Sequence, residues 1–347
     1  MIPLSSLWAL SLVLSALALF IMSGLIAARF VDGRRKRAIT AQRDALLPLL
    51  LGASPDEDLL LLARSDPLIL AELSLELIDL VRGEEREQFV ATASRLGIPV
   101  TLRHQLKRGS RRVRTLAAEK LAQFPDEHCT AALEDALSDR DSSVRLAAAL
   151  SLATSERAPP VRWLVDRLAL GTDEQSMLIV TLLGDLARQR PEEVRALIEA
   201  KNVPGSIRAA AIEALTASGD YSLVGLITSL ALEAAHDAPE LPRYIRALGS
   251  FQHPAAHPAI IRGLASPTWW VRAAAAEAAG RISFEDTAEV LGALLDDPDW
   301  WVRFRAGEAL VRLGRTGERQ LTQIRQEGSE RARDAARLTI AEQAVAA

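Results

Sequence analysis

The segments WWVRAAAAEAA at residues 269–279 and WWVRFRAGEAL at residues 300–310 nearly repeat each other, 31 residues apart. Self-similarity at a fixed period of roughly 20 to 50 residues is typical of solenoids. Each unit of such an array buries its apolar face against its neighbours. The duplicate therefore predicts a helical repeat array, and such an array favours a protein-binding scaffold over an enzyme.

The same pattern returns along most of the chain. Clear copies begin at Val113, Val144, Ile207 and Ala332, and degenerate copies lie near Met177 and Tyr244. A β-branched residue followed by alanines three and four positions later places small apolar side chains on one helical face. With 49% hydrophobic but only 4% aromatic residues, the composition also favours helix. We therefore predict an all-α solenoid of about eight helix pairs over residues 98–347.

These blocks resemble the HEAT-repeat family, in particular the short bacterial form called PBS-lyase HEAT-like repeats. The resemblance rests on the pattern D-x-(D)-x-x-V-R-x-x-A-A-x-x-L and covers residues 98–347. It implies a ladder in which turn aspartates meet helix arginines, and a role as an adaptor for other proteins. The copies near Met177 and Tyr244 lack Val-Arg, and Ser266 and Thr268 replace the aspartates expected before Arg272, so the chain departs from the ladder there.

The N-terminal region predicts a membrane anchor. Residues 2–28 contain no charged side chain, and a helix needs only about 20 apolar residues to cross a bilayer. A basic cluster follows, formed by Arg29, Arg34, Arg35, Lys36 and Arg37. By the positive-inside rule, the chain after this cluster is cytoplasmic. A cleaved signal peptide fits less well, because no basic residue precedes the apolar run.

The expected organisation therefore has four parts. Residues 1–28 are the transmembrane anchor, 29–37 a basic juxtamembrane segment, 38–97 an atypical helical cap, and 98–347 the repeat solenoid. In the cap we expect helices over residues 38–51, 66–81 and 84–96, the last closed by Gly97. Only four lysines against many arginines, with abundant alanine, suggest a GC-rich bacterial source and hence the bacterial inner membrane.

The tryptophan pairs are the candidate partner-binding residues. Trp and Arg are frequent at the energetic centres of protein interfaces. The candidate set is Trp269, Trp270, Arg272, Trp300, Trp301, Arg303 and Arg305. The alternative is that the tryptophans fill gaps between repeats. Because adjacent helical residues point about 100° apart, one tryptophan of each pair is expected to be buried and the other exposed.

A second candidate surface is the stretch 103–114, which has six Arg or Lys residues and no acid. Such a stretch suits anionic lipid headgroups or an acidic partner. The alternative is a solvated edge between two helices.

Catalytic and metal-binding patterns are absent from the sequence. It has no GxGxxG, GxxxxGK[ST], GxSxG or HExxH motif. His253 and His257 are each followed by proline, which argues against a helical metal-binding face, and Cys129 is the single cysteine. We therefore expect no enzyme activity, no cofactor and no metal.

The combined expectation is a single-pass scaffold whose cytoplasmic solenoid holds another protein at the inner membrane. The resemblance points to a membrane enzyme assembly, for example an exopolysaccharide synthase with its glycosyltransferase. Two alternatives are a bilin-lyase-like enzyme, which the anchor disfavours, and a HEAT-fold nucleic-acid-binding protein. Beyond residue 37 the chain has a net charge of −8, which argues against nucleic acid as a partner.

Overall fold

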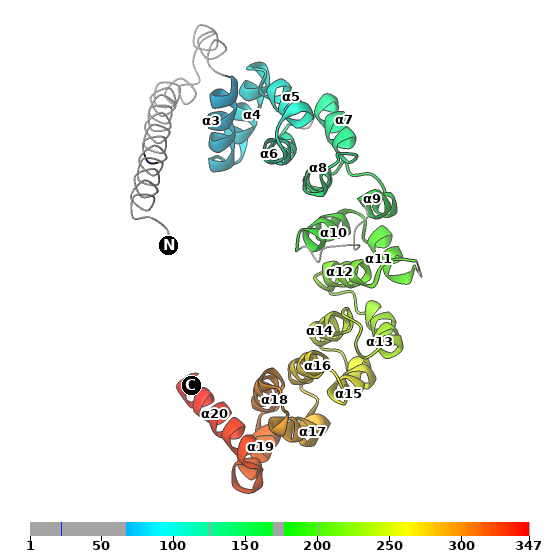
Figure 1. The fold of residues 1–347 in the computed structure, drawn as a ribbon, viewed down its shortest axis with the longest axis vertical. Helices are drawn as coiled ribbons and strands as arrows, with labels where there is room; N and C mark the ends of the chain where they lie inside the picture. The colour runs from blue at the N-terminus through cyan, green and yellow to red at the C-terminus, as the bar shows by residue number, and fades with distance from the viewer. Residues whose placement is uncertain (1–21, 23–66, 125, 169–176, 201, 347) are drawn as a thin grey trace, which may run out of the picture. The chain divides into compact units, whose positions relative to one another are not determined.

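The computed structural model describes residues 22, 67–124, 126–168, 177–200 and 202–346. Within these ranges every regular element is a helix, which confirms the predicted all-α fold (Figure 1). The longer helices are α3 (Pro67–Leu80), α4 (Glu84–Arg95), α5 (Ile98–Arg108), α6 (Arg111–Leu121), α7 (Glu127–Ala136), α8 (Ser142–Thr154), α9 (Val161–Leu168), α10 (Met177–Gln189), α11 (Pro191–Glu199), α12 (Gly205–Thr216), α13 (Leu223–Glu233), α14 (Leu241–Phe251), α15 (His257–Leu264), α16 (Trp269–Ile282), α17 (Ala288–Ala293), α18 (Trp300–Arg312), α19 (Arg315–Glu327) and α20 (Glu330–Ala346).

The predicted anchor at residues 2–28 and the basic cluster at 29–37 lie outside the described ranges, apart from Met22. The helix expected over 38–51 also lies outside them. Where the chain is described, no helix is long and apolar enough to cross a membrane.

The chain divides into two compact units, Met1–Ala136 and Leu137–Ala347. In the first unit α5 packs against α3, α4, α6 and α7. The helices predicted over 66–81 and 84–96 are present as α3 and α4. Gly97 follows α4 in the left-handed conformation, with φ of 76°, where glycine is the favoured residue.

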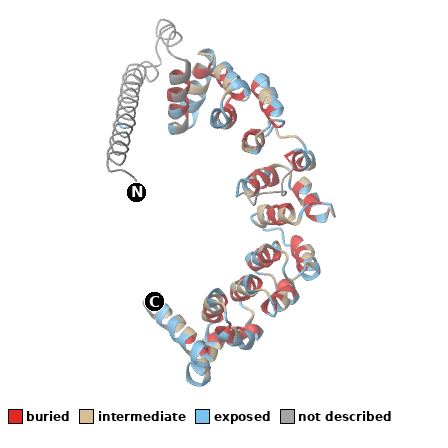
Figure 2. Cartoon of the chain, in the orientation of Figure 1, coloured by how far each residue is buried: buried red, intermediate tan, exposed pale blue. Residues whose placement is uncertain are grey.

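The second unit is built from helix pairs arranged in two rows (Figure 1). In each pair the second helix contains one copy of the sequence repeat. These second helices, α8, α10, α12, α14, α16, α18 and α20, each pack against the next and form what we call the second-helix row. Figure 2 shows buried residues on the sides of the helices that face their neighbours. The apolar face of each pair is thus covered by the adjacent pairs, as a solenoid requires.

Glycines set the spacing of the second-helix row. A Cβ on Gly280 of α16 would lie 2.6 Å from the Cα of Ala309 in α18, and one on Gly249 of α14 would lie 2.9 Å from the Cα of Ala278 in α16. Gly307 of α18 is equally close to the Thr339 side chain of α20. At Gly249 and Gly280 neighbouring second helices are therefore in backbone-to-backbone contact, and at Gly307 the backbone of α18 meets a side chain of α20.

This contact predicts the effect of adding a methyl group. We expect Gly280→Ala to lower the free energy of unfolding by about 1–3 kcal/mol, because the backbone of Ala309 must move to accommodate it. Gly225 in α13 is the matched control, because it is exposed and a Cβ there would meet nothing within 4 Å. Gly225→Ala should be neutral or stabilise by up to about 1 kcal/mol. Urea unfolding followed by circular dichroism measures both changes, and equal effects would contradict the close contact.

Candidate functional site

All four tryptophans of the repeated segments are exposed to solvent. Trp269 and Trp270 are 39% and 41% exposed, and Trp300 and Trp301 are 47% and 49% exposed. The expectation that one of each pair is buried is therefore wrong, and the tryptophans do not fill a gap between repeats. Each pair occupies the first two positions of its helix, where it projects beyond the contact with the neighbouring helices.

The buried position of each repeat comes one residue later. Val271 and Val302 are fully buried at the start of α16 and α18. Behind them the seam between the helices is filled by alanine and glycine, for example Ala275 and Ala306. A seam of this width has no room for an indole ring, which explains why the tryptophans remain outside it.

The exposed rings contact one another within each helix. The ring centroids of Trp269 and Trp270 are 5.7 Å apart, and those of Trp300 and Trp301 are 4.7 Å apart, both in edge-on geometry. Phe304, one helical turn after Trp300, stacks on it at 5.2 Å with an interplanar angle of 13°. We call these five residues the aromatic edge. Phe304 did not figure among the sequence-based candidates, although its spacing of four from Trp300 is a signal for such contact.

Arg272 is largely buried and is held by contacts within the chain. Its Nε and Nη2 donate to the two carboxylate oxygens of Asp297 at 2.7 and 2.9 Å, and its Nη1 donates to the Ser266 carbonyl at 2.9 Å. The Arg272 side chain is only 14% exposed and that of Asp297 only 5%. Since Asp297 precedes α18, this pair joins two successive repeats.

Arg303 repeats the turn contact of Arg272 one repeat later. Its Nη1 donates to the carbonyls of Asp297 and Pro298 at 2.7 and 3.0 Å. Arg305 is more accessible, but it pairs with Glu308 at 2.7 Å and lies 3.8 Å from Glu277. The structure therefore assigns Arg272 and Arg303 to the frame that supports the tryptophans.

The turn at Ser266 keeps its geometry without aspartate. The Oγ of Ser266 accepts the backbone N–H of Thr268 at 3.3 Å, as the Asp297 carboxylate accepts that of Asp299 at 2.9 Å. The expected departure from the Asp–Arg ladder is thus limited. Ser266 replaces the turn hydrogen bond of Asp297, and its carbonyl still receives Arg272. Thr268, which stands at the N-cap position of Asp299, makes no side-chain capping bond.

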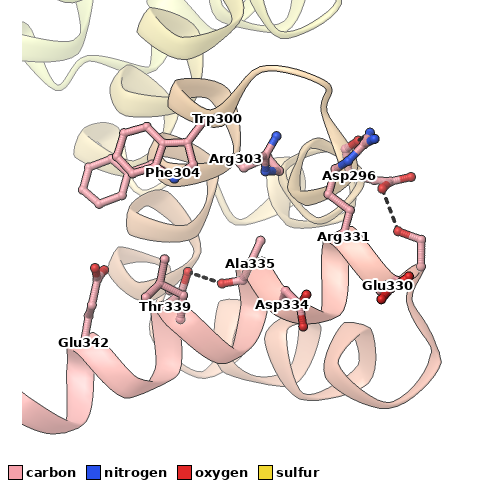
Figure 3. Close-up of a pocket in the computed structure, with 12 residues that line it drawn as sticks. Asp296, Trp300, Arg303, Phe304, Glu330, Arg331, Asp334, Ala335, Thr339 and Glu342 are labelled. Carbon is pink, nitrogen blue, oxygen red and sulfur yellow. Dashed lines mark hydrogen bonds between the residues drawn. The ribbon is translucent and has the colours of Figure 1, made fainter.

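A groove of about 730 Å³ lies between α18 and α20, next to the aromatic edge (Figure 3). Trp300 and Phe304 of α18 form one wall, and Leu338, Thr339 and Glu342 of α20 form the opposite wall. At its other end the groove is polar, and its remaining lining residues are Asp296, Arg303, Ser329, Glu330, Arg331, Asp334 and Ala335.

The other candidate residues have structural environments. Burial and hydrogen bonding to Asp126 raise the pKa of the Cys129 thiol to about 12, so the thiol is protonated at neutral pH and is a poor nucleophile. His253 accepts a backbone N–H as a helix cap, and His257 contacts Asp286 at 2.7 Å. Among the described residues, no group of three His, Cys, Asp or Glu side chains is arranged to hold a metal.

The basic stretch 103–114 forms the end of α5 and the start of α6. Lys107, Arg108, Arg111 and Arg112 are exposed there. Arg114 is buried, and its Nη1 donates to the Gly109 carbonyl at 3.1 Å. This arginine therefore fixes the turn between the two helices and is not part of an accessible basic surface.

Comparison with known proteins identifies the repeats. The family model described as HEAT repeats matches residues 99–176, 231–311 and 258–342, which together are more than half of the chain. The chain belongs to the HEAT-repeat family. The family match also includes α16 and α18, so the aromatic edge lies on HEAT repeats. No curated protein matches the chain.

Several solved structures are similar to the chain. One is a Kap121p mutant, which is 14% identical with a TM-score of 0.48, over 87% of this chain and 38% of that one. Kap121p bound to RanGTP is also 14% identical, with a TM-score of 0.47. An engineered protein is 19% identical with a TM-score of 0.36, over 81% of this chain and 86% of its own. The chain spans about two fifths of the Kap121p chains that it matches.

The Arg272–Asp297 pair predicts a large loss of stability when it is broken. We expect Arg272→Met to lower the free energy of unfolding by about 2–4 kcal/mol, because it leaves the nearly buried Asp297 carboxylate without its charged partner. The control is Arg162→Met in the exposed Arg162–Asp166 pair, which should cost less than about 0.5 kcal/mol. Urea midpoints of both variants test this, and a small effect at Arg272 would show that the pair does not join the repeats.

Proposed function

We propose that the chain is a non-enzymatic, membrane-anchored scaffold whose HEAT solenoid binds another protein at the bacterial inner membrane. The observation that carries the proposal is the aromatic edge, with four tryptophans exposed side by side in pairs on adjacent repeats. Large exposed aromatic clusters are uncommon on surfaces that contact only water, and they mark interaction sites.

The setting of the aromatic edge supports a protein partner. Its rings stand on helices joined by the Arg272–Asp297 pair and by the glycine contacts, so they are held in place before binding. Preorganised side chains lose little entropy on binding, which favours affinity. The apolar run at residues 2–28 and the basic cluster after it would fix the solenoid at the membrane and raise its effective concentration near a membrane-associated partner. A synthase–glycosyltransferase assembly is one partner of this class.

The exposed tryptophans give the first test. In a detergent pull-down with the full tagged chain, we expect the double variants Trp269→Ser/Trp270→Ser and Trp300→Ser/Trp301→Ser to lose at least tenfold of the captured partner. The loss follows because interface tryptophans commonly contribute about 2 kcal/mol or more each. Quantitative mass spectrometry measures the capture.

Trp163→Ser is the matched control for this experiment. Trp163 is also exposed, at 46%, but it lies on α9, a first helix. This variant should capture the partner as the wild type does, and all variants should melt at similar temperatures. Equal capture by every variant, or an empty pull-down with the wild type, would contradict the proposal.

The anchor is tested by fractionation. We expect the full chain to remain in bacterial membranes after alkaline carbonate extraction, because about 20 apolar residues suffice for stable insertion. A variant with Leu17, Leu19 and Ile21 changed to Asp should appear in the supernatant, while Arg35→Gln, a single change in the basic cluster, should leave the chain in the membrane. Release of the unchanged chain by carbonate would refute the membrane-anchored part of the proposal.

A further inference from the structure

We propose that the groove between α18 and α20 binds the cationic side chain, arginine or lysine, of a peptide segment in the partner. This inference rests on the proposed scaffold function and names the chemistry of the segment that the scaffold holds. Three features of the groove lead to it: an aromatic wall, a facing carboxylate, and basic lining residues that are already engaged.

The aromatic wall consists of Trp300 and Phe304. Their rings stack nearly parallel, so each covers one face of the other, and Arg305 already lies 5.7 Å from the centroid of the Phe304 ring. The ring left to a ligand at the mouth of the groove is therefore that of Trp300. Trp301 packs edge-on against Trp300 and supports its orientation. A cation positioned over an indole face is attracted by the electron-rich ring, and tryptophan gives the strongest such contact among the aromatic residues.

The facing wall supplies negative charge. Figure 3 shows Glu342 of α20 across the groove from the rings of Trp300 and Phe304. Glu342 is exposed, and no described residue forms an ion pair with it. Asp334 also lines the groove. Among the described residues it forms an ion pair with Arg337 alone, and both of these side chains are more than half exposed. A cation in the groove would therefore touch a ring on one side and a carboxylate on the other.

The basic residues of the groove offset only part of this charge. Arg303 donates to the carbonyls of Asp297 and Pro298, and Arg331 donates to the carbonyl of Asp296 at 3.1 Å. The groove lining also contains four acidic residues against these two basic ones. An acidic or phosphorylated segment would be repelled, and a purely apolar segment would cover Glu342 without giving it a partner.

The size of the groove fits a side chain together with the backbone that carries it. Its volume of about 730 Å³ is larger than one arginine or lysine side chain needs. At the polar end Ser329 also lines the groove, although it already donates to Asp296 at 2.6 Å. The groove therefore suits a short extended peptide whose cationic residue points toward Trp300.

The test uses the full chain in mild detergent, labelled with 5-fluorotryptophan and observed by fluorine NMR. The probe is an eight-residue Gly/Ser peptide with two arginines, and its counterpart carries neutral citrulline at both positions. We expect the arginine peptide to shift the Trp300 resonance while the Trp163 resonance stays unchanged. The citrulline peptide should bind at least about threefold more weakly, since it lacks the charge needed for both contacts.

Two variants then test the contributions of the aromatic wall and the acidic wall to binding separately. Glu342→Gln and Trp300→Leu should each weaken binding of the arginine peptide by about threefold to tenfold. The matched controls are Glu327→Gln, exposed on α19, and Trp163→Leu on α9, which should change it by less than twofold. In Trp300→Leu, binding is followed at the Trp301 resonance, because Trp301 packs against position 300. Unchanged resonances of Trp269 and Trp270 show that each variant is folded.

The inference is overturned if the citrulline peptide binds equally well, or if Glu342→Gln and Trp300→Leu leave binding intact. It is also overturned if the chain self-associates through this groove, which light scattering would show as a dimer lost in Trp300→Leu.

The outcome for the scaffold proposal is distinguishable from the outcome for the cationic segment. If the wild type captures a partner and Glu342→Gln captures it equally, the scaffold stands and the cationic segment does not. If the wild type captures nothing, the scaffold itself fails.

Discussion

The close approach of successive second helices is the constraint on which the second unit depends. At Gly249 and Gly280 the neighbouring backbone occupies the space that a Cβ would need. Only alanine and glycine fit along such a seam, which explains the low aromatic content and the Ala-rich repeats. The same constraint excludes large side chains from the seam, so the tryptophans at the start of α16 and α18 must lie on the surface.

A narrow seam of small side chains buries little apolar area per residue. Hydrogen bonds from arginines add to the contacts that hold neighbouring repeats together. Arg272 reaches forward to Asp297 of the next repeat, whereas Arg243 reaches back to Glu213 with Nε–O and Nη2–O distances of 2.6 and 2.8 Å. Arg262 donates to the carbonyls of Ala231 and Ala234, at the end of α13 in the previous repeat. The Arg262 bonds satisfy carbonyls that the end of α13 leaves without intrahelical partners, and all three arginines connect neighbouring repeats.

The sequence predicted the repeats well because period and side-chain size are local properties. The alanines after Val271 and Val302 located the buried faces of α16 and α18, and the family match agrees. The environment of the tryptophans could not be predicted, because it depends on where the first helical turn lies relative to the adjacent pair. The ion pair of Arg272 could not be predicted either, since its partner Asp297 is 25 residues away and meets it only when the repeats stack. The groove was missed for a related reason, as Glu342 lies 42 residues beyond Trp300.

The position of the groove follows from a change in helix direction. α16 and α18 run alongside each other in the second-helix row, whereas α20 is inclined to α18 (Figures 1 and 3). The two helices meet closely at Gly307 and Thr339 and then diverge, so space opens beside Trp300 and Phe304. Because α20 is inclined to α18, part of the aromatic edge becomes one wall of a groove whose other wall is acidic. Such a groove can select one type of side chain, whereas an exposed aromatic surface alone attracts any apolar group.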